Sequence, residues 1–340
     1  MRSPYKLKRL QVGRAFIALY ALALAACSPT VADGPEQWRA VAVEVAPVTL
    51  GVESVGALRF RGGIEISSDD PVFGGLSGIE VLDDNRILAI SDNGDWFEAQ
   101  LLLDEAGALI GVSDVRTAFM RDEDGRLFPS KATGDSEDLA QLPDGRFAVS
   151  FEQTQTIRIY DFNRDGPFGA ARLGPRLDGV ARLPSNVGLE ALTATSDGAL
   201  LVGAEGGGGA TPLWIAPLDA QAPVPLRIRY PLAEGFSLTS LDRMPTGGFV
   251  ALERFYAPVI GAQARITVFP EASLTAGGET LADVRELAVL SPPLMVDNFE
   301  GVTAQLLPNG DVRLYILSDD NFSARQRTLL YAFDISSPPR

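Results

Sequence analysis

The sequence contains no histidine, and that absence excludes whole classes of chemistry. A Ser-His-Asp triad, a phosphohistidine mechanism and the usual His-ligated zinc site each need an imidazole as base, nucleophile or ligand. Cysteine is almost as scarce, because Cys27 is the only one in the chain. No disulfide can therefore form within the chain.

Acidic residues are missing from the first 26 positions, whose charges are all basic: Arg2, Lys6, Lys8, Arg9 and Arg14. The apolar run over residues 16–26 is too short and too asymmetric for a spanning helix, so residues 1–26 are predicted to be a secretory signal. The junction Leu24-Ala25-Ala26-Cys27 resembles the lipobox of bacterial lipoproteins. We expect Cys27 to be lipidated, which would remove its thiol from catalysis; the alternative is an incidental thiol near a cleavage site.

Positive charge is scarce in the rest of the chain, where Lys131 is the only lysine. Removal of residues 1–26 lowers the formal net charge from −15 to −20. Nucleic-acid binding needs a basic face and is not expected, and an anionic substrate would need a bound cation. Residues 27–40, with Pro29, Gly34 and Pro35, are predicted to be a tether. Residues 41–340 are predicted to form one domain.

The domain contains a repeated hairpin: an apolar strand, a tight turn, and a returning strand that ends at an acid. Five copies begin at residues 77, 137, 190, 239 and 300. Turns such as Pro143-Asp144-Gly145 and Pro308-Asn309-Gly310 are strong hairpin signals, because Asn and Gly accept the positive φ of tight turns. One or two further strands follow each hairpin, and four strands at this period are typical of a β-propeller blade.

We therefore predict an all-β fold, a single β-propeller with five blades. A sixth blade within residues 100–130 or 260–295 stays an alternative. The last copy has only a third strand, over residues 328–333, so the early strand over residues 58–66 is expected to pair with it and close the ring. A large β-sandwich is the competing fold, but it would not explain the repeat.

Acids recur at fixed places in the hairpins. In three copies the opening residue and the closing acid are 15 positions apart, and two antiparallel strands of this length place both at one rim near the propeller axis. Two unit charges about 4 Å apart repel by about 4 kcal/mol at an effective dielectric constant of 20. The rim therefore needs cations, arginine partners or raised pKa values. The acids expected there are Asp92, Glu137, Glu152, Glu190, Glu205, Glu253, Glu300 and Asp319.

Carboxylates without histidine or thiolate suit calcium best, with magnesium second. We favour a metal or substrate site at this rim. The alternative is structural, in which the acids cap loops through backbone N–H groups or pair with Arg254, Arg325 and Arg327. Lys131, six residues before the second copy, is either a surface lysine or an anion-binding group.

Several short motifs carry a resemblance to a known family: Ser91-Asp92-Asn93-Gly94, Asp135-Ser136-Glu137, Gly188-Leu189-Glu190, Leu252-Glu253-Arg254, Asp297-Asn298-Phe299-Glu300-Gly301, Ser318-Asp319-Asp320-Asn321-Phe322 and Gln326-Arg327-Thr328. Over residues 70–335 the chain resembles the phytase-like family with esterase-like activity, a β-propeller family of secreted bacterial proteins. The chain departs from the family at Asp135-Ser136-Glu137-Asp138, where members have Asp-Pro-Glu-Gly, and its fourth copy lacks an opening acid. The resemblance implies hydrolysis of phosphoesters or related esters.

The sequence thus predicts an envelope-anchored, calcium-dependent hydrolase of a small anionic ester. The expected catalytic residues are Glu137, Glu190 and Glu300, and Asp320 joins the rim acids as an expected metal ligand. Phosphate oxygens are expected to bind Arg254, Arg325 and Lys131. We expect a monomer that contacts membrane only through its lipid. The alternative is a non-catalytic, calcium-stabilised propeller that binds a glycan or protein partner.

Overall fold

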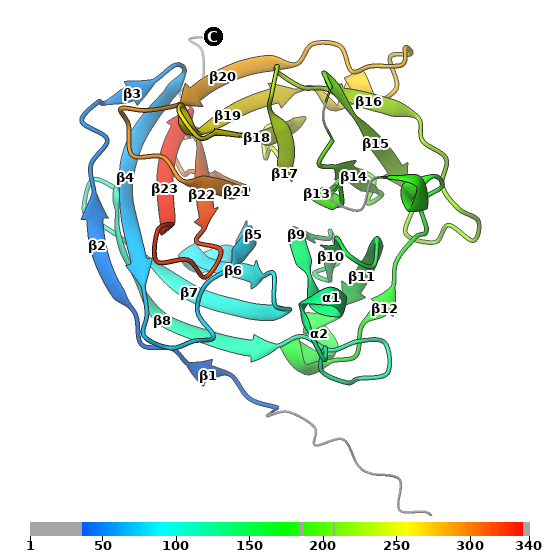
Figure 1. Ribbon diagram of the computed structural model, residues 1–340, viewed down its shortest axis with the longest axis horizontal. Coiled ribbons are helices and arrows are strands. Elements are labelled where there is room, and N and C mark those ends of the chain that lie inside the picture. Colours follow the sequence, from blue (N-terminus) through cyan, green and yellow to red (C-terminus); the bar gives the residue numbers. More distant parts are fainter. Residues whose placement is uncertain (1–35, 184–186, 207, 336–340) are drawn as a thin grey trace, which may run out of the picture. The chain divides into compact units, whose positions relative to one another are not determined.

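The computed structural model describes residues 36–183, 187–206 and 208–335, which belong to one compact unit, Asp33–Arg340. Their strands form five antiparallel sheets arranged around a central axis as a five-bladed β-propeller (Figure 1). The predicted fold class is confirmed. Among the described residues, no helix has the length and apolar character needed to cross a membrane.

The blades are numbered in chain order of their innermost strands. Blade 1 contains β5 (Leu76–Val81), β6 (Arg86–Ser91), β7 (Asp95–Leu103), β8 (Leu109–Phe119) and β1 (Arg39–Ala40). Blade 2 contains β9 (Ser136–Gln141), β10 (Phe147–Phe151), β11 (Thr156–Tyr160) and β12 (Arg172–Leu173). Blade 3 contains β13 (Leu189–Ala194), β14 (Leu200–Ala204), β15 (Ala210–Ala216) and β16 (Ile228–Pro231).

Blade 4 contains β17 (Ser237–Arg243), β18 (Phe249–Ala257), β19 (Gly261–Phe269) and β20 (Arg285–Leu290). Blade 5 contains β21 (Asn298–Leu306), β22 (Val312–Asp319), β23 (Thr328–Ile335), β4 (Leu58–Ser67), β2 (Glu44–Val48) and β3 (Ser54–Val55). Helices are short: α1 (Lys131–Gly134), α2 (Phe162–Asp165), and the 3₁₀ turns η1 (Asp83–Asn85), η2 (Gly166–Phe168), η3 (Val180–Arg182) and η4 (Glu271–Leu274).

The N-terminal part of the domain closes the ring. β4 pairs antiparallel with β23, with Ile64 opposite Leu330, so the last blade uses strands from both ends of the domain. This pairing confirms the prediction for residues 58–66. β1 lies within the predicted tether, yet it pairs with β8 through Arg39 and Thr117. The domain therefore begins slightly earlier than residue 41.

Five apolar clusters hold the blades together, one between each pair of neighbours. The cluster between blades 4 and 5 contains Phe299, Tyr331 and Phe333, all fully buried. Because each sheet packs on both faces, inner strands are continuously apolar instead of alternating, as in the wholly buried β14. The five innermost strands contact one another around the axis, in the order β5, β9, β13, β17 and β21 (Figure 1).

Each inner hairpin contains a β-bulge at the same place, just after the strand begins. In blade 3, Leu189 pairs with Ala204 and Ala191 with Gly203, so Glu190 is the extra residue. A bulge bends the strand and re-aims the side chain of the extra residue. The equivalent residues of the five blades are Ser77, Glu137, Glu190, Thr239 and Glu300.

Candidate functional site

Two sets of equivalent positions meet at one end of the axis. The first is the set of bulge residues. The second lies on the next strand of each hairpin, one residue past the partner of the residue that precedes the bulge: Asp92, Glu152, Glu205, Arg254 and Asp319. Together with Asp135 and Lys131, the charged members form what we call the acidic mouth: Asp92, Lys131, Asp135, Glu137, Glu152, Glu190, Glu205, Arg254, Glu300 and Asp319.

Arg254 is the arginine of the acidic mouth and links three blades. Its guanidinium donates to Glu205 Oε1 of the neighbouring blade 3 at 3.0 Å and to Asn298 Oδ1 of blade 5 at 2.8 Å. It also forms an ion pair with Glu300. Asn298 in turn donates its side-chain amide to Glu300 Oε1 at 2.8 Å. Arg254 therefore offsets the charge of two acids and is held in place by them.

The prediction that Glu253 joins the rim is wrong by one residue of register. Ser237 pairs with Arg254, so Arg254 occupies the position equivalent to Asp92 in blade 1. Successive side chains of a strand point to opposite faces, and Glu253 therefore points away from the mouth, into the space between blades 3 and 4. There it is fully buried, pairs with Arg265 at 2.5 Å and accepts from Tyr230 Oη at 2.6 Å. The 15-residue spacing, counted from Thr239, would have indicated Arg254.

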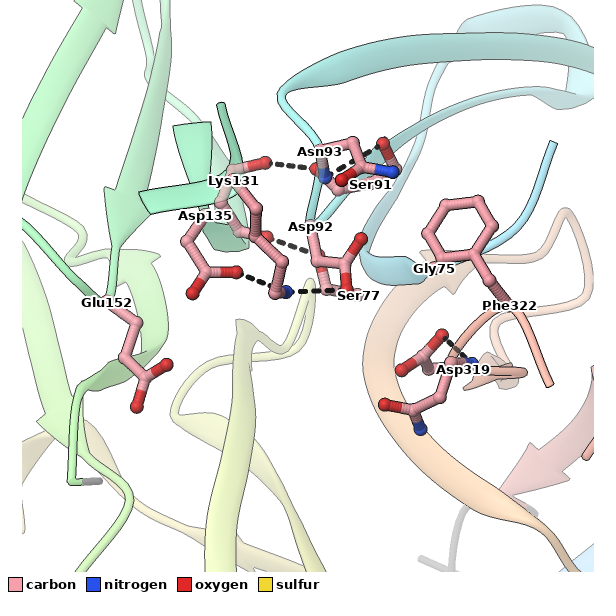
Figure 2. A network of polar contacts seen from close by, with 12 residues as sticks. Gly75, Ser77, Ser91, Asp92, Asn93, Lys131, Asp135, Glu152, Asp319 and Phe322 are labelled. Carbon is pink, nitrogen blue, oxygen red and sulfur yellow. Dashed lines mark hydrogen bonds and ion pairs between the residues drawn. The ribbon is translucent and has the colours of Figure 1, made fainter. Parts of the chain in front are cut away.

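Lys131 supplies the second cation, from helix α1 in front of blade 2. Its Nζ donates to Asp92 Oδ2 at 2.6 Å and to Asp135 Oδ1 at 2.5 Å, and Figure 2 shows the ammonium between the two carboxylates. The lysine side chain is half exposed, whereas Asp135 is buried. Asp92 belongs to blade 1, so this contact links blades 1 and 2.

Several carboxylates of the acidic mouth have raised pKa values. Burial, and next the charges of neighbouring glutamates, raise the pKa of both Glu137 and Glu190 well above the usual range. Burial and the charge of Glu300 raise the pKa of Asp319 to about 8. For Glu300 itself, burial raises the pKa and Arg254 opposes the rise. The rim thus shows both responses expected of crowded acids: paired cations and raised pKa values.

The donor set fits a hard divalent cation. One oxygen each from Asp135, Glu137 and Glu152 lies within 4.8 Å of the others. In the described part of the chain, Glu137 and Glu190 have no hydrogen-bond partner, and Asp92 Oδ1 is a buried acceptor with none. Buried oxygens without donors are suited to a cation, and a set made only of oxygen favours calcium, then magnesium.

Asp320, predicted as a metal ligand, is instead engaged by protein donors. Its Oδ1 accepts the backbone N–H groups of Gly75 at 3.0 Å and Phe322 at 2.9 Å, and its Oδ2 accepts from Thr328 Oγ1 at 3.2 Å. Phe322 consequently adopts a left-handed backbone, φ 49°, with its ring against Gly74 and Gly75. Asp320 thus ties the loop after β22 to the start of blade 1.

The chain matches, over residues 71–322, the family described as phytase-like, with the esterase-like activity of phytase. The chain belongs to this family. The comparison with curated proteins gives no match. The motifs that carried the resemblance lie almost entirely at the acidic mouth, so family membership and geometry point to the same end of the propeller.

Solved propellers resemble this phytase-like chain only distantly. A putative gluconolactonase is 12% identical, with a TM-score of 0.44, over 89% of this chain and 93% of its own. The PQQ-bound aldose sugar dehydrogenase of Streptomyces coelicolor is 13% identical, with a TM-score of 0.40, over 86% and 99%. Virginiamycin B lyase of Staphylococcus aureus is 9% identical, with a TM-score of 0.38, over 87% and 100%.

Three residues of the phytase-like site occur in the sequence motifs but were not predicted as site residues: Asp135, Asp138 and Asn298. Asp135 lies opposite Glu152, and Asn298 lies opposite Asp319. Each stands two residues before the bulge glutamate of its blade. That spacing was available as a signal. Asp138 is different, because its carboxylate lies below the mouth and binds other blades, which only the closed ring reveals.

Asp138 closes the axis beneath the acidic mouth. Its Oδ2 accepts the N–H groups of Leu192 at 2.9 Å and Leu241 at 3.2 Å, and the hydroxyl of Ser240 at 3.1 Å. A Cβ on Gly78 would lie 2.9 Å from Asp138 Cα, so the inner strands are already in contact there. The carboxylate of Asp138 therefore lies between the inner strands of blades 2, 3 and 4.

The remaining predicted residues divide into three groups. Asp92, Glu137, Glu152, Glu190, Glu205, Glu300 and Asp319 come together with Arg254 and Lys131, and their roles as ligands or catalysts stay predictions. Arg325 lines a cavity beside the mouth. Cys27 and the predicted signal lie outside the described residues.

Proposed function

We propose that this protein is a metal-dependent hydrolase of phosphoesters or related esters, with calcium as the favoured ion and magnesium second. The observation that supports it most is the acidic mouth: seven predicted acids around two cations, with one buried carboxylate oxygen, Asp92 Oδ1, that lacks a donor among the described residues. Membership of a family described by esterase-like activity of phytase supports the hydrolase class.

Asp135, Glu137 and Glu152 would hold the ion, with Asp92 beside them. Bound there, calcium would polarise a phosphoryl oxygen of the substrate and lower the pKa of a bound water. It would also offset the charge that otherwise keeps an anionic substrate from so acidic a site. Binding would compete with protons for the same carboxylates, because a ligating carboxylate must be ionised.

The chain's own groups would complete the reaction. Glu190 has no partner in the described residues and a pKa raised by burial, so it is suited to hold a proton and pass it to the leaving oxygen. Arg254 and Lys131 carry the positive charge for non-reacting phosphate oxygens. Both are fixed by carboxylates, and Arg254 spans Glu205 and Glu300. Beneath these groups, Asp138 holds the inner strands of three blades together.

The proposal includes a location at the bacterial cell envelope, with a lipid on Cys27. Its support is the basic N-terminus, the apolar run over residues 16–26 and the lipobox-like Leu24-Ala25-Ala26-Cys27. The strongly acidic remainder supports a small-molecule substrate and not nucleic acid as the partner. A monomer is proposed because the ring leaves no inner sheet edge open.

The test is hydrolysis by the full chain of p-nitrophenyl phosphate, phytate and a carboxyl ester, with calcium and with a chelator. We expect turnover that chelation removes and added calcium restores. Glu300→Gln should lower kcat by roughly 10- to 100-fold, because Glu300 fixes the guanidinium of Arg254 and a hydrogen bond between charged groups is worth about 1.5–3 kcal/mol. Glu105→Gln, at the exposed β7–β8 turn, is the matched control and should leave kcat unchanged.

Activity that ignores chelation, or that survives Glu300→Gln, would contradict this mechanism. A different outcome would favour the non-catalytic alternative: no substrate turns over, while calcium still raises the melting temperature. In that case the acidic mouth would be a calcium-stabilised surface for a glycan or protein.

A further inference from the structure

A cavity of about 790 Å³ lies directly beside the acidic mouth, between blades 4 and 5. It shares Glu205 and Arg254 with the mouth, and its outer walls contain Tyr256, Asn298, Ser323 and Arg325. Pockets of about 300–1,000 Å³ bind ligands of drug size. Inorganic phosphate or a single small ester at the mouth would leave this space unfilled.

Arg325 gives the cavity an unused positive charge. It lies in the loop between β22 and β23 and is exposed, and within the described residues its guanidinium has no hydrogen bond or ion pair. Arg254, by contrast, is fully paired. A guanidinium with five free donors is well suited to a carboxylate or phosphate group.

Tyr256 gives the cavity an unused aromatic face. Two residues beyond Arg254 on β18, it lies on the same side of the strand and about 7 Å further from the mouth, at about 3.4 Å per residue. The side chain is 70% exposed, and no aromatic ring among the described residues packs on it. Behind it, Phe255 packs on Phe236 with ring centroids 5.4 Å apart, which stiffens this wall.

A neighbouring glycine keeps the wall open. Gly235 lines the cavity with φ 77°, and a Cβ there would lie 2.9 Å from the ring of Phe255. The strand and the loop therefore present an aromatic wall on the blade 4 side. The opposite wall, from blade 5, contains amides, a hydroxyl, the free arginine, the carboxyl group of Asp297 and the apolar Val296.

We propose that this cavity binds the organic part of the substrate, and that this part is an aromatic group bearing a second anionic group. The reacting phosphate lies at the acidic mouth, the ring packs on Tyr256 and the second anion pairs with Arg325. This assignment rests on the proposed function, because it places the reacting ester at the mouth. It deepens that function by giving the substrate class.

The kinetic test compares three phosphate monoesters of primary alcohols: benzyl, cyclohexylmethyl and 4-carboxybenzyl phosphate. In each, water attacks phosphorus, the P–O bond to the alcohol breaks and the alcohol oxygen takes a proton, so the leaving groups are closely matched. With calcium present, the full chain should prefer benzyl over cyclohexylmethyl phosphate by about 3- to 10-fold in kcat/KM, as expected for an aromatic pair. The added carboxylate should increase kcat/KM by a further 10-fold or so, as expected for a charged hydrogen bond.

Two variants assign these preferences to residues. Tyr256→Leu should abolish the preference for the ring and keep that for the carboxylate, and Arg325→Gln should do the reverse. Arg227→Gln, an exposed arginine at the other end of blade 3, is the control and should change neither. All three positions are exposed, so unchanged melting temperatures are expected.

A binding measurement separates this inference from the proposed function. Calorimetry with 4-carboxybenzylphosphonate, which cannot be hydrolysed, should show binding that both Tyr256→Leu and Arg325→Gln weaken by about 5-fold or more. If no ester is hydrolysed but this pattern appears, the hydrolase proposal fails and the cavity assignment stands. Absence of binding, or binding and preferences that neither variant changes, would overturn the assignment.

Discussion

Two glycines make room for the carboxylates of the acidic mouth. A Cβ on Gly188 would lie 1.8 Å from Cγ of Glu152 in the preceding blade, and one on Gly75 would lie 2.3 Å from Asp92 Oδ1. Neither distance is compatible with a real side chain, so the acids occupy space that only glycine leaves. In the first pair, the acid of one blade thus depends on a glycine of the next.

Gly188→Ala should therefore displace Glu152 and destabilise the protein. We expect the free energy of unfolding to fall by about 1–3 kcal/mol, as for other overpacked sites. Gly111→Ala is the matched control, since its Cβ would meet no atom closer than 3.4 Å. Urea unfolding of both variants checks this, and equal stabilities would contradict it.

Asp95 is a buried acid near the mouth whose charge opposes folding. Burial raises its pKa to about 7, and among the described residues only the hydroxyl of Ser91, at 3.4 Å, donates a hydrogen bond to it. The folded pKa of Asp95 thus lies above the unfolded value of about 3.9. The protonated carboxyl therefore contributes its full share of stability below about pH 3.9, and this share is lost as the pH rises to about 7.

Asp95→Asn should prevent this loss of stability at higher pH, because asparagine does not ionise. Relative to wild type, the variant should gain stability between pH 4 and pH 8, by up to about 4 kcal/mol at 1.36 kcal/mol per pKa unit. Denaturant unfolding at several pH values measures the gain, with the exposed Asp69→Asn as control. A difference between Asp95→Asn and wild type that does not change with pH would show that Asp95 does not titrate in this range.

At the scale of strands, one side chain joins three strands of the inner ring. Asp138 on β9 accepts backbone N–H groups from β13 and β17, so three blades share its carboxylate. Burial raises its pKa well above the usual range, and the N–H of Leu192 opposes the rise most. The bulges that turn Glu137, Glu190 and Glu300 toward the mouth lie at the same height along the axis as Asp138.

Asp138→Ala should leave these buried donors without an acceptor. We expect a loss of roughly 2–5 kcal/mol in the free energy of unfolding, at about 1–3 kcal/mol per unsatisfied group. Asp138→Asn keeps one acceptor oxygen and should lose less. Thermal and urea unfolding compare the two, and an alanine variant as stable as the asparagine variant would contradict a bridging role.

At the scale of the whole molecule, the ring depends on the pairing of β4 with β23. A chain that begins at residue 70 would lack β1 to β4 and expose β23 as an open edge. We expect it to aggregate on size-exclusion chromatography, because an unpaired apolar strand is a template for association. A chain that begins at residue 36 keeps every described strand and is the control. A monomeric, stable product from residue 70 would show that closure is dispensable.

Local pattern was enough to determine much of this protein. The hairpins follow from turn residues that accept positive φ, such as Gly145 and Gly310, and from apolar strands at a regular spacing. The same spacing placed Glu137, Glu190 and Glu300 at equivalent positions. These features depend on the backbone and on neighbours in sequence, which is why the fold and most of the acidic mouth were predictable.

Only the tertiary structure decided which blades share a residue. In blade 4 the 15-residue spacing from Thr239 indicates Arg254, but only the structure shows that Arg254 pairs with Glu205 and Glu300 of the two neighbouring blades, and that Glu253 pairs with Arg265. The bridges made by Asp138 and by Lys131 join residues from different blades. Such contacts exist only once the ring has closed, because closure alone brings distant strands within hydrogen-bonding distance.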